Sequence, residues 1–544
     1  MHVRTLAALT ALPLAVTLGV SACGGDSDTG GSGSDYVASI GIGEPQFLVP
    51  SNTTESNGHN VLNALFTPLV EYDEDLRPVE VAAESITTED NETWTIKLRD
   101  GWTFHNGERV TSDSYINAWN AGAYGPNAHN GNYFFEKIEG YPDLNPADAT
   151  ATPKATKLTG LKKIDDGTFQ VVLGEPYVNF KSMLGNNVFL PLPTAAFADV
   201  ATNKITDAFN EAPIGQGPFR MKGRWQHHQQ IETEKYADFK GDEKPKIGGV
   251  RFKIYQQQTT QYQDMLAGQL DVVPQVPLEN IANAKSDIGD RFVQRPASLF
   301  QFLAFPTFDP KFKSLEIRRA ISMAIDREEI VKTIFAGSQK AAYSFVSPVV
   351  PGYRDNACGE ACKFKPAEAK KMFDAAGGAA AVGYKIQISY NEDGGHKLWV
   401  DATCDQIEAN LGVDCVGSPE PRFADLLTQV ERKQPVGMLR LGWSFDYPAM
   451  ESYLGPLYAT GGSSNYCGYS NPRFDQLVAD GDRARTPQEA IKMYQRAEDI
   501  LAQELPMLPL RFGRNNFAHS TGVKNVSMDL FNTVELLKLE ANDA

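Results

Sequence analysis

One long apolar run, "TLAALTALPLAVTLGV", stands at the start of the chain. Arg4 precedes it, and the small residues of "GVSACGG" follow it, which is the three-part order of a secretory signal. Pro13 makes the run a poor membrane-spanning helix. No later stretch approaches the run of about 20 apolar residues that a transmembrane helix needs. The sequence therefore predicts that the rest of the chain folds outside the bilayer.

Cys23 follows this leader and opens the segment "GGDSDTGGSGSD", which has no side chain able to build a core. Such a Gly/Ser-rich segment behaves as a flexible tether. The motif Val20-Ser21-Ala22-Cys23 resembles a bacterial lipobox. This resemblance implies a signal peptide at 1–22, a diacylated (palmitate-bearing) Cys23, and a lipid-anchored tether at 23–35. An ordinary cleaved signal with an incidental cysteine is the alternative.

Length and charge limit the domain number and the partners. Roughly 510 residues follow the tether, more than one hydrophobic core usually organises, so we expect two or three domains. The formal charge is −17, and removal of the leader with its single Arg4 makes it −18. An acidic balance of this size disfavours nucleic acid and anionic lipid headgroups as partners.

Five cysteines remain after Cys23. In an exported chain close pairs oxidise, so we expect Cys358 to bond Cys362 and Cys404 to bond Cys415, with Cys467 left over. A metal site at the first pair is disfavoured, because no histidine or second cysteine pair stands at ligand spacing nearby.

Strand and helix patterns mix along the body, which predicts an α/β fold. Residues 93–98, "TWTIKL", alternate apolar and polar side chains as a half-buried strand does. Thr111 or Ser112 is expected to cap a helix that runs through about Trp119.

Helix signals return later in the chain. Asp326 is expected to cap a helix that Gly337 ends. The last helix is predicted at about 487–504, before the prolines of "ELPMLPLRF" return the chain to strand form.

The segment "RLGWSFDY" places a cation and an anion six residues apart. If the chain is extended as far as the aspartate, Arg440, Gly442, Ser444 and Asp446 share one face, since successive side chains of a strand alternate. A free peptide carries a positive charge at one end and a negative charge at the other. The spacing, at most about 20 Å of strand, suits an extended peptide of about three to five residues. On spacing alone, surface residues or structural ion pairs are the alternative for Arg440 and Asp446.

Several blocks together resemble one known family. They are "ESITTEDNETWTIKLRDGWTFHNGERVTSDS", "GQGPFRMKGRW", "AGQLDVVPQVP", "FKSLEIRRAISMAIDREEIVKTIFAG" and "GYSNPRFDQLV". The residues of these blocks and their order resemble those of the extracellular solute-binding proteins of peptide/nickel-type ABC importers, the oligopeptide/dipeptide-binding protein family. The likeness covers about 36–544. One departure is Ser114, where the family usually has an aspartate.

The resemblance implies an α/β, two-lobed, periplasmic-binding-protein-like fold with an extra subdomain in the first lobe and a ligand cleft between the lobes. By resemblance, lobe I takes 36–75, 190–295 and 505–544, the extra subdomain 76–189, and lobe II 296–504. The chain is expected to cross between lobes near Arg295 to Phe302 and near Glu504 to Leu510.

The resemblance also implies roles for the charged segment. Asp446 is expected to bind the α-ammonium group of a peptide, and Arg440 to face its C-terminal end. The backbone groups of Gly442 and Ser444 are expected to pair with the ligand backbone. Trp443 is either core or a wall of the cleft, and the loop at 44–58 is either a ligand contact or a solvated loop.

The implied function is a lipid-anchored, monomeric component of an ABC importer. It captures short peptides and hands them to permease and ATPase subunits at the outer face of the cell membrane, and it touches that membrane through its lipid only. A different solute, such as an oligosaccharide, opine or metal chelate, is the alternative.

An enzyme is not expected. The sequence lacks GxSxG, HExxH, GxxxxGK[ST] and GxGxxG motifs. Eight histidines, with the adjacent His227 and His228 facing opposite ways on a strand, offer no metal site. We therefore expect neither a cofactor nor a resident metal.

Overall fold

The computed structural model describes residues 35–148, 150–434 and 436–542. The predicted signal peptide, the lipidation site Cys23 and nearly all of the tether lie outside the described residues. Among the helices of the described part, none is long and apolar enough to cross a membrane.

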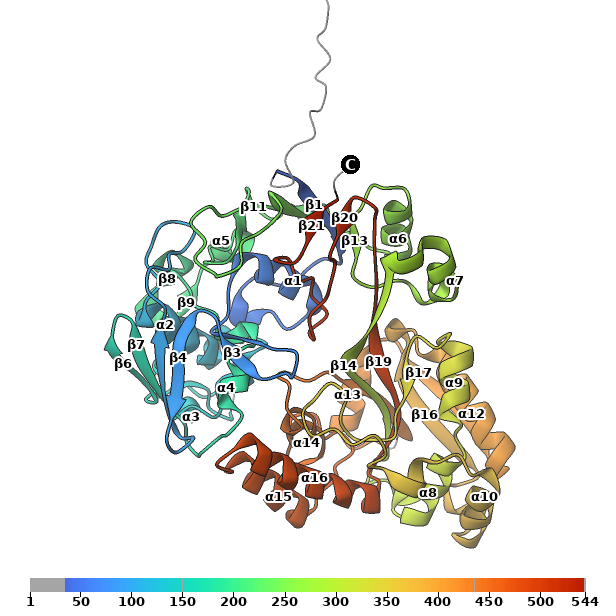
Figure 1. Ribbon diagram of the computed structural model, residues 1–544. Helices are drawn as coiled ribbons and strands as arrows, with labels where there is room; N and C mark the ends of the chain where they lie inside the picture. Colours follow the sequence, from blue (N-terminus) through green and yellow to red (C-terminus); the bar gives the residue numbers. More distant parts are fainter. Residues whose placement is uncertain (1–34, 149, 435, 543–544) are drawn as a thin grey trace, which may run out of the picture.

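One large mixed sheet runs through the molecule (Figure 1). Its order is β10-β11-β12-β1-β13-β19-β14-β18-β16-β17, and β15 pairs with β19. In that order the strands are Phe219–Met221, Gln230–Lys235, Gly249–Ile254, Val37–Ile42, Val272–Val273, Met507–His519, Phe292–Ala304, Met438–Trp443, Lys385–Asn391 and Asp414–Glu420, with β15 at Lys340–Ala341.

Smaller sheets stand beside it. A four-stranded sheet has the order β4-β5-β7-β6, with strands Ala83–Thr88, Thr93–Leu98, Thr168–Val172 and Leu161–Asp165. Three two-stranded ribbons pair β2 (Val70–Tyr72) with β3 (Pro78–Glu80), β8 (Phe197–Asp199) with β9 (Lys204–Ile205), and β20 (Val523–Lys524) with β21 (Glu540–Ala541).

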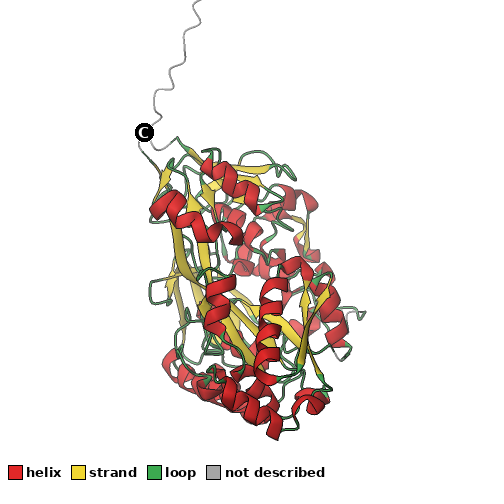
Figure 2. Ribbon diagram, turned by 90° about the vertical axis from the view of Figure 1, so that its right-hand side faces the viewer, coloured by secondary structure: helices red, strands yellow, loops and turns green. Residues whose placement is uncertain are grey.

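Helices cover the outside of the strands (Figure 2). The first eight are α1 (Ser56–Leu65), α2 (Ser112–Ala123), α3 (Tyr141–Leu144), α4 (Phe180–Met183), α5 (Asp207–Glu211), α6 (Gln258–Leu266), α7 (Leu278–Ile288) and α8 (Leu315–Met323). The others are α9 (Arg327–Ile334), α10 (Pro366–Ala375), α11 (Gly378–Ala381), α12 (Lys397–Leu411), α13 (Phe423–Glu431), α14 (Glu451–Tyr458), α15 (Pro472–Asp482) and α16 (Pro487–Glu504).

Two hydrophobic cores organise the chain. The first core draws mainly on residues 38–272 and 523–539, and the second core mainly on residues 300–512. A smaller cluster packs α6 and α7 against the upper ends of β14 and β19. Each core removes its own set of apolar side chains from water, which lets the two halves behave as separate bodies.

The antiparallel strands β14 and β19 connect the two halves. Each is 13 residues long, and their pairing runs from Phe292 opposite Ala518 to Ala304 opposite Met507. The pairing shifts register between Pro296 and Phe300. A bend in this pair would change the angle between the two cores, as a hinge does.

Local predictions for the early part of the chain are confirmed, with one difference in length. In β5 the alternate residues Trp94, Ile96 and Leu98 are buried. The helix α2 begins after Thr111, whose backbone N–H donates to the Ser114 hydroxyl at 3.1 Å. Serine thus fills the capping position where the family resemblance leads us to expect aspartate. The helix runs four residues beyond Trp119, because the added turn is buried against the first core.

The later helices also begin and end where the sequence predicts. The Asp326 carboxylate accepts the backbone N–H of Glu329 at 3.0 Å and caps α9. Gly337 follows this helix with φ +70°, a conformation that favours glycine. The last helix, α16, spans Pro487–Glu504 as predicted.

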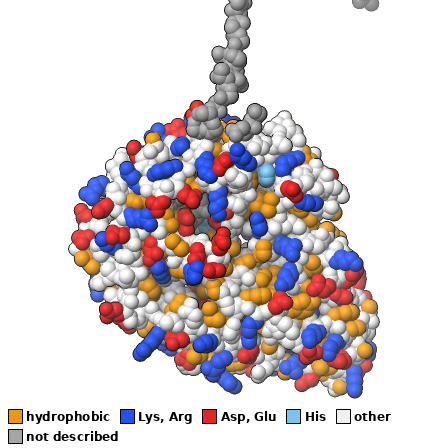
Figure 3. Space-filling view, in the orientation of Figure 1, with side chains coloured by type: hydrophobic (Ala, Val, Ile, Leu, Met, Phe, Trp, Pro, Cys, Tyr) orange, Lys and Arg blue, Asp and Glu red, His pale blue; other side chains and the backbone are white. Residues whose placement is uncertain are grey.

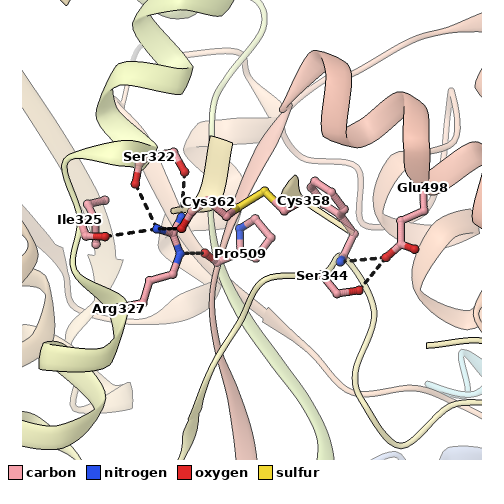
Figure 4. The surroundings of a disulfide bond; sticks show 9 residues. Ser322, Ile325, Arg327, Ser344, Cys358, Cys362, Glu498 and Pro509 are labelled. Atoms are coloured by element: carbon pink, nitrogen blue, oxygen red, sulfur yellow. Dashed lines mark hydrogen bonds between the residues drawn. A yellow bond between two sulfur atoms is a disulfide. The ribbon is translucent and has the colours of Figure 1, made fainter. Parts of the chain in front are cut away.

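Both predicted disulfides are present, Cys358–Cys362 and Cys404–Cys415, and Cys467 is a buried free thiol. The first disulfide lies beside Arg327, a fully buried arginine (Figure 4). Its guanidinium donates to the carbonyl oxygens of Ser322, Ile325, Cys362 and Pro509 and to the Ser322 hydroxyl, at 2.7–3.2 Å. Such a complete set of acceptors is typical of a buried arginine that stabilises the fold.

The prediction of one strand through Asp446 is wrong for its last three residues. β18 ends at Trp443, and the chain then turns toward α14. The backbone N–H of Asp446 donates to the Ser452 hydroxyl in the first turn of α14, at 2.8 Å. This bond, with Pro448 just beyond, ends the extended conformation.

Candidate ligand-binding site

Arg440 leaves the middle of β18 and is only 9% exposed. Its guanidinium donates to Gln301 Oε1 at 2.7 Å and to Asn391 Oδ1 at 3.1 Å. Gln301 lies on β14 and Asn391 ends β16, so the two neighbouring strands hold the arginine from both sides. The cation is thereby fixed in position before any ligand arrives.

Gly442 lies on the same face of β18 as Arg440, directly opposite Gln301 of β14. A Cβ atom at Gly442 would lie 2.6 Å from Gln301 Nε2. The absent side chain therefore makes room for Gln301 to cross β18 and reach Arg440. The structure thus brings together two of the predicted residues, Arg440 and Gly442, through a third that the sequence pattern did not indicate.

Trp443 and Ser444 take different positions. The Trp443 indole N–H donates to the Ser452 carbonyl oxygen at 2.7 Å, and its half-buried ring packs against the second core. Trp443 therefore holds the start of α14. Ser444 is exposed beyond the end of the strand, so its backbone groups do not continue the β18 ladder.

Asp446 lies at the junction of the two halves. Its neighbour Phe445 belongs to the second core, and Tyr447 belongs to the first. The carboxylate accepts the Tyr133 hydroxyl at 3.3 Å, and the backbone carbonyl accepts the Asn186 amide at 3.0 Å. The side chain thus faces residues that come from the other half of the molecule.

The environment of Asp446 favours a cationic partner. Burial raises the pKa of its carboxyl to about 7, and the negative charge of Glu451 adds to the shift, while the Tyr133 hydrogen bond opposes it. Among the described residues no lysine, arginine or histidine forms an ion pair with Asp446. A half-buried carboxylate without a cation is costly, so an incoming ammonium group would be strongly favoured.

The loop at 44–58 lies beside the residues that face Asp446. The Ser51 hydroxyl contacts His129 Nδ1 at 2.8 Å, and the Ser51 carbonyl accepts the Gly131 N–H at 3.0 Å. Tyr133, two residues farther, is 41% exposed. The loop therefore supports the wall opposite Asp446 through its own hydrogen bonds.

The surface is hollowed near the middle of the face seen in Figure 3, between the upper and lower halves, with charged side chains around the hollow. Separately, a cavity of about 300 Å³ lies where α7, the loop after α9 and the strands β14 and β19 meet. Amide side chains line part of it, among them Gln275, Gln339 and Asn516. The two halves therefore also leave space beside β14 and β19, the strands that connect them.

A second contact between the halves consists of three tyrosines and two carboxylates, Tyr177, Tyr447, Tyr494, Glu451 and Asp482, which we term the tyrosine–carboxylate cluster. The Tyr177 hydroxyl donates to Glu451 at 2.7 Å and contacts the Tyr447 hydroxyl, which itself bonds Glu451. The Tyr494 hydroxyl donates to Asp482 at 2.8 Å.

The three tyrosines and Glu451 of the cluster are buried, Asp482 is partly buried, and a lysine lies near Asp482. Lys137 Nζ lies 3.7 Å from Asp482 and 4.2 Å from the centre of the Tyr177 ring. Burial nevertheless raises the pKa of Asp482 to about 7, helped by the charge of Glu451 and opposed by Lys137. This contact joins the segment at 137–179 to α14, α15 and α16.

Sequence reasoning missed Tyr133, Gln301 and Arg511. Nothing in the local pattern around Tyr133 or Gln301 marks them, because their roles depend on partners more than 130 residues away. Arg511 had a usable signal: it is the one charged residue in the apolar stretch "MLPLRFG". A lone cation inside a buried strand needs a specific partner. Within the described residues, no group of three or more His, Cys, Asp and Glu side chains could hold a metal ion.

Comparison with known proteins identifies the family of this chain. A family model described as "Bacterial extracellular solute-binding proteins, family 5 Middle" matches residues 77–465. The oligopeptide-binding protein OppA of Bacillus subtilis (strain 168) is 26% identical over 542 residues, which cover 96% of each chain. The periplasmic oligopeptide-binding protein OppA of Escherichia coli (strain K12) is 24% identical, over 88% of this chain and 89% of that one.

Solved structures show the same fold. The Escherichia coli murein tripeptide binding protein MppA aligns with a TM-score of 0.75 at 21% identity, over 93% of this chain and 98% of that one. Haemophilus influenzae OppA in complex with RPPGFSPFR aligns with a TM-score of 0.74 at 24% identity, over 93% and 99%. The predicted two-lobed α/β fold is thereby confirmed.

The family match also bears on the choice between binder and catalyst. Proteins of this family bind solutes for transport and are not enzymes, which agrees with the prediction from motifs. The match covers well over half of the chain, so the protein belongs to the bacterial extracellular solute-binding proteins of family 5.

Proposed function

We propose that this protein captures short peptides between its two lobes for an ABC importer. Asp446 binds the α-ammonium group of the peptide, and Arg440 binds its C-terminal carboxylate. The observation that carries the proposal is Asp446 itself, a carboxylate at the junction of the two halves with a hydroxyl partner but no cation among the described residues.

The relatives named above support a peptide as the solute, because they are oligopeptide- and murein tripeptide-binding proteins. Arg440 supports the orientation, since its two amide partners present the guanidinium at the other end of the same segment. Between the two charges the partly exposed backbone of Gly442 offers hydrogen bonds that any peptide sequence can use.

The domain division that goes with this proposal is the one expected from the family resemblance. Lobe I comprises 36–75, 190–295 and 505–544 with the extra subdomain at 76–189, and lobe II comprises 296–504. Opening and closure of the lobes bend β14 and β19, the two strands that connect them. We further propose that Cys23 carries the lipid anchor and that the loaded monomer docks on permease subunits.

Titration calorimetry of the purified mature protein tests the proposal. Tripeptides to pentapeptides with free termini are expected to bind, while cello- and xylo-oligosaccharides give no heat. Heat from the sugars and none from the peptides would replace the peptide with the oligosaccharide alternative. Mass spectrometry of whatever co-purifies with the protein gives an independent identification of the solute.

A further inference from the structure

Two buried arginines lie on the two strands that flank β14, Arg511 on β19 and Arg440 on β18. Arg511 of β19 stands directly opposite Gln301 of β14, and Gln301 accepts a hydrogen bond from Arg440 of β18. Arg511 is 3% exposed, and its pKa is lowered by burial first and by the charge of Arg440 second. Adjacent buried cations are costly unless an anion or a full set of acceptors compensates them.

Arg511 lacks the acceptors that a structural arginine has. Arg327 makes five hydrogen bonds, whereas Arg511 makes one, from Nη1 to Gln339 Oε1 at 2.9 Å. Its Nε has no partner, and no carboxylate among the described residues forms an ion pair with it. The rings of Phe335 and Trp399, 4.3 and 5.1 Å from its guanidinium carbon, supply the rest of its environment.

His396 does not add to the local charge. Burial and the two nearby arginines lower its pKa to about 3, so the ring is neutral at physiological pH. In the proposed function one ligand carboxylate reaches Arg440. That leaves the charge of Arg511 to be balanced by something else.

The cavity of about 300 Å³ lies one side chain away from Arg511, which does not itself line it. Two of the three residues around its guanidinium, Phe335 and Gln339, line this cavity. A volume of this size is at the lower end of the range for small-ligand pockets. The amide oxygen of Gln339 occupies the place of a carboxylate oxygen, and it can rotate away when a charged acceptor forms the stronger bond.

We propose that Arg511 binds a second negative charge on the ligand, so that the preferred ligand is a short peptide whose C-terminal residue has a carboxylate side chain. The inference rests on the proposed function, in which Arg440 takes the terminal carboxylate. Arg511 is then a specificity residue, and Gln339 is the neutral group that the acidic side chain displaces.

Titration with matched tetrapeptides tests the inference. Ala-Ala-Ala-Glu is expected to bind about tenfold to a hundredfold more tightly than Ala-Ala-Ala-Gln, since a charged hydrogen bond replaces a neutral one. Glu-Ala-Ala-Ala serves as a control of equal charge and is expected to bind no better than Ala-Ala-Ala-Gln. Equal affinities for the first two peptides would overturn the inference and leave the proposed function intact.

Two variants locate the effect. Arg511→Gln is expected to abolish the preference for the C-terminal glutamate. Gln339→Glu supplies a carboxylate at the position that already accepts from Arg511, so it is expected to abolish the preference while keeping the fold, as thermal unfolding would show. Retention of the preference in either folded variant would contradict the role of Arg511. If none of the peptides binds the native protein, both the inference and the proposed function fail.

Discussion

At the scale of single residues, the proposed function depends most on Asp446. Asp446→Asn keeps the shape of the side chain and removes the charge that we propose binds the ammonium group of a peptide. The loss of one charged hydrogen bond is expected to cost about 1.5–3 kcal/mol, or roughly tenfold to a hundredfold in affinity for free peptides. Calorimetry of the native protein and of the variant, with free and N-acetylated forms of one peptide, measures this loss of affinity. Equal binding of both forms by the native protein would exclude the proposed role.

The pKa of Asp446 also predicts how binding depends on pH. In the free protein burial raises this pKa to about 7, and an ammonium partner would lower it, so binding below pH 7 releases a proton. Affinity is therefore expected to rise with pH up to about 7 and to fall above about 8, where the peptide amino group loses its proton. Asp446→Asn is expected to remove the rise in affinity up to about pH 7 and to leave the fall above about pH 8 unchanged. A native affinity that stays constant from pH 5 to 7 would contradict this.

Residue-scale predictions succeeded where the chemistry is local. The caps at Thr111 and Asp326 depend only on side chains within three positions, so the sequence contains all of the information. The partners of Arg440 and Asp446 could not be predicted, because Gln301 and Tyr133 reach them only after distant strands and loops come together.

At the scale of elements, Gly442 of β18 leaves the space through which Gln301 reaches Arg440. Gly442→Ala places a methyl group against Gln301 Nε2, so Gln301 must move away from Arg440. We expect peptide affinity to fall about threefold to tenfold, because Arg440 loses one positioning bond. The free energy of unfolding should change by less than about 1.5 kcal/mol, since the clash is with the end of a flexible side chain.

A double-mutant cycle with Gln301→Ala provides the control. In that background the added methyl group has no side chain to displace, so Gly442→Ala is expected to have no further effect on affinity. Additive losses in the double variant would show that Gln301 does not connect the two residues.

The elements themselves could largely be predicted. The alternation in β5 and the apolar stripe and proline boundary of α16 gave the correct type and nearly the correct bounds. β18 was predicted three residues too long, because a strand pattern cannot show that Ser452, at the next helix, captures the backbone of Asp446. Both disulfides could be predicted, since the cysteines of each pair are only 4 and 11 residues apart in the sequence.

At the scale of the whole molecule, the tyrosine–carboxylate cluster between the two halves is expected to make the free energy of unfolding depend on pH. The folded-state pKa of Asp482 is raised above its unfolded value to about 7, so the folded protein holds a proton that the unfolded chain releases. This contribution to stability is present below about pH 4 to 5 and is lost as the pH rises toward 7. Asp482→Asn is expected to flatten the dependence of the unfolding free energy between pH 5 and 7, measured by denaturant titration.

The control for this prediction is Asp475→Asn, a carboxylate on the same helix that lies outside the cluster. This variant is expected to keep the pH dependence of the native protein. If Asp482→Asn and the native protein lose stability in parallel between pH 5 and 7, the cluster is not the source of the effect.

The overall architecture was predicted through resemblance and not from first principles. Alternating patterns indicated mixed α/β structure, but the pairing of β14 with β19 across more than 200 residues has no local signal. That pairing joins strands of both cores in one sheet. Only the set of matching sequence blocks made the two-lobed fold predictable.

The most direct measurement is a crystal structure of the mature protein with a bound tetrapeptide that has free termini. The nitrogen at the amino terminus of the peptide is expected to lie within about 3 Å of an Asp446 carboxylate oxygen, as a charge-assisted hydrogen bond requires. The terminal carboxylate is expected to lie at the guanidinium of Arg440. A peptide bound in the opposite direction, or away from both residues, would contradict the account.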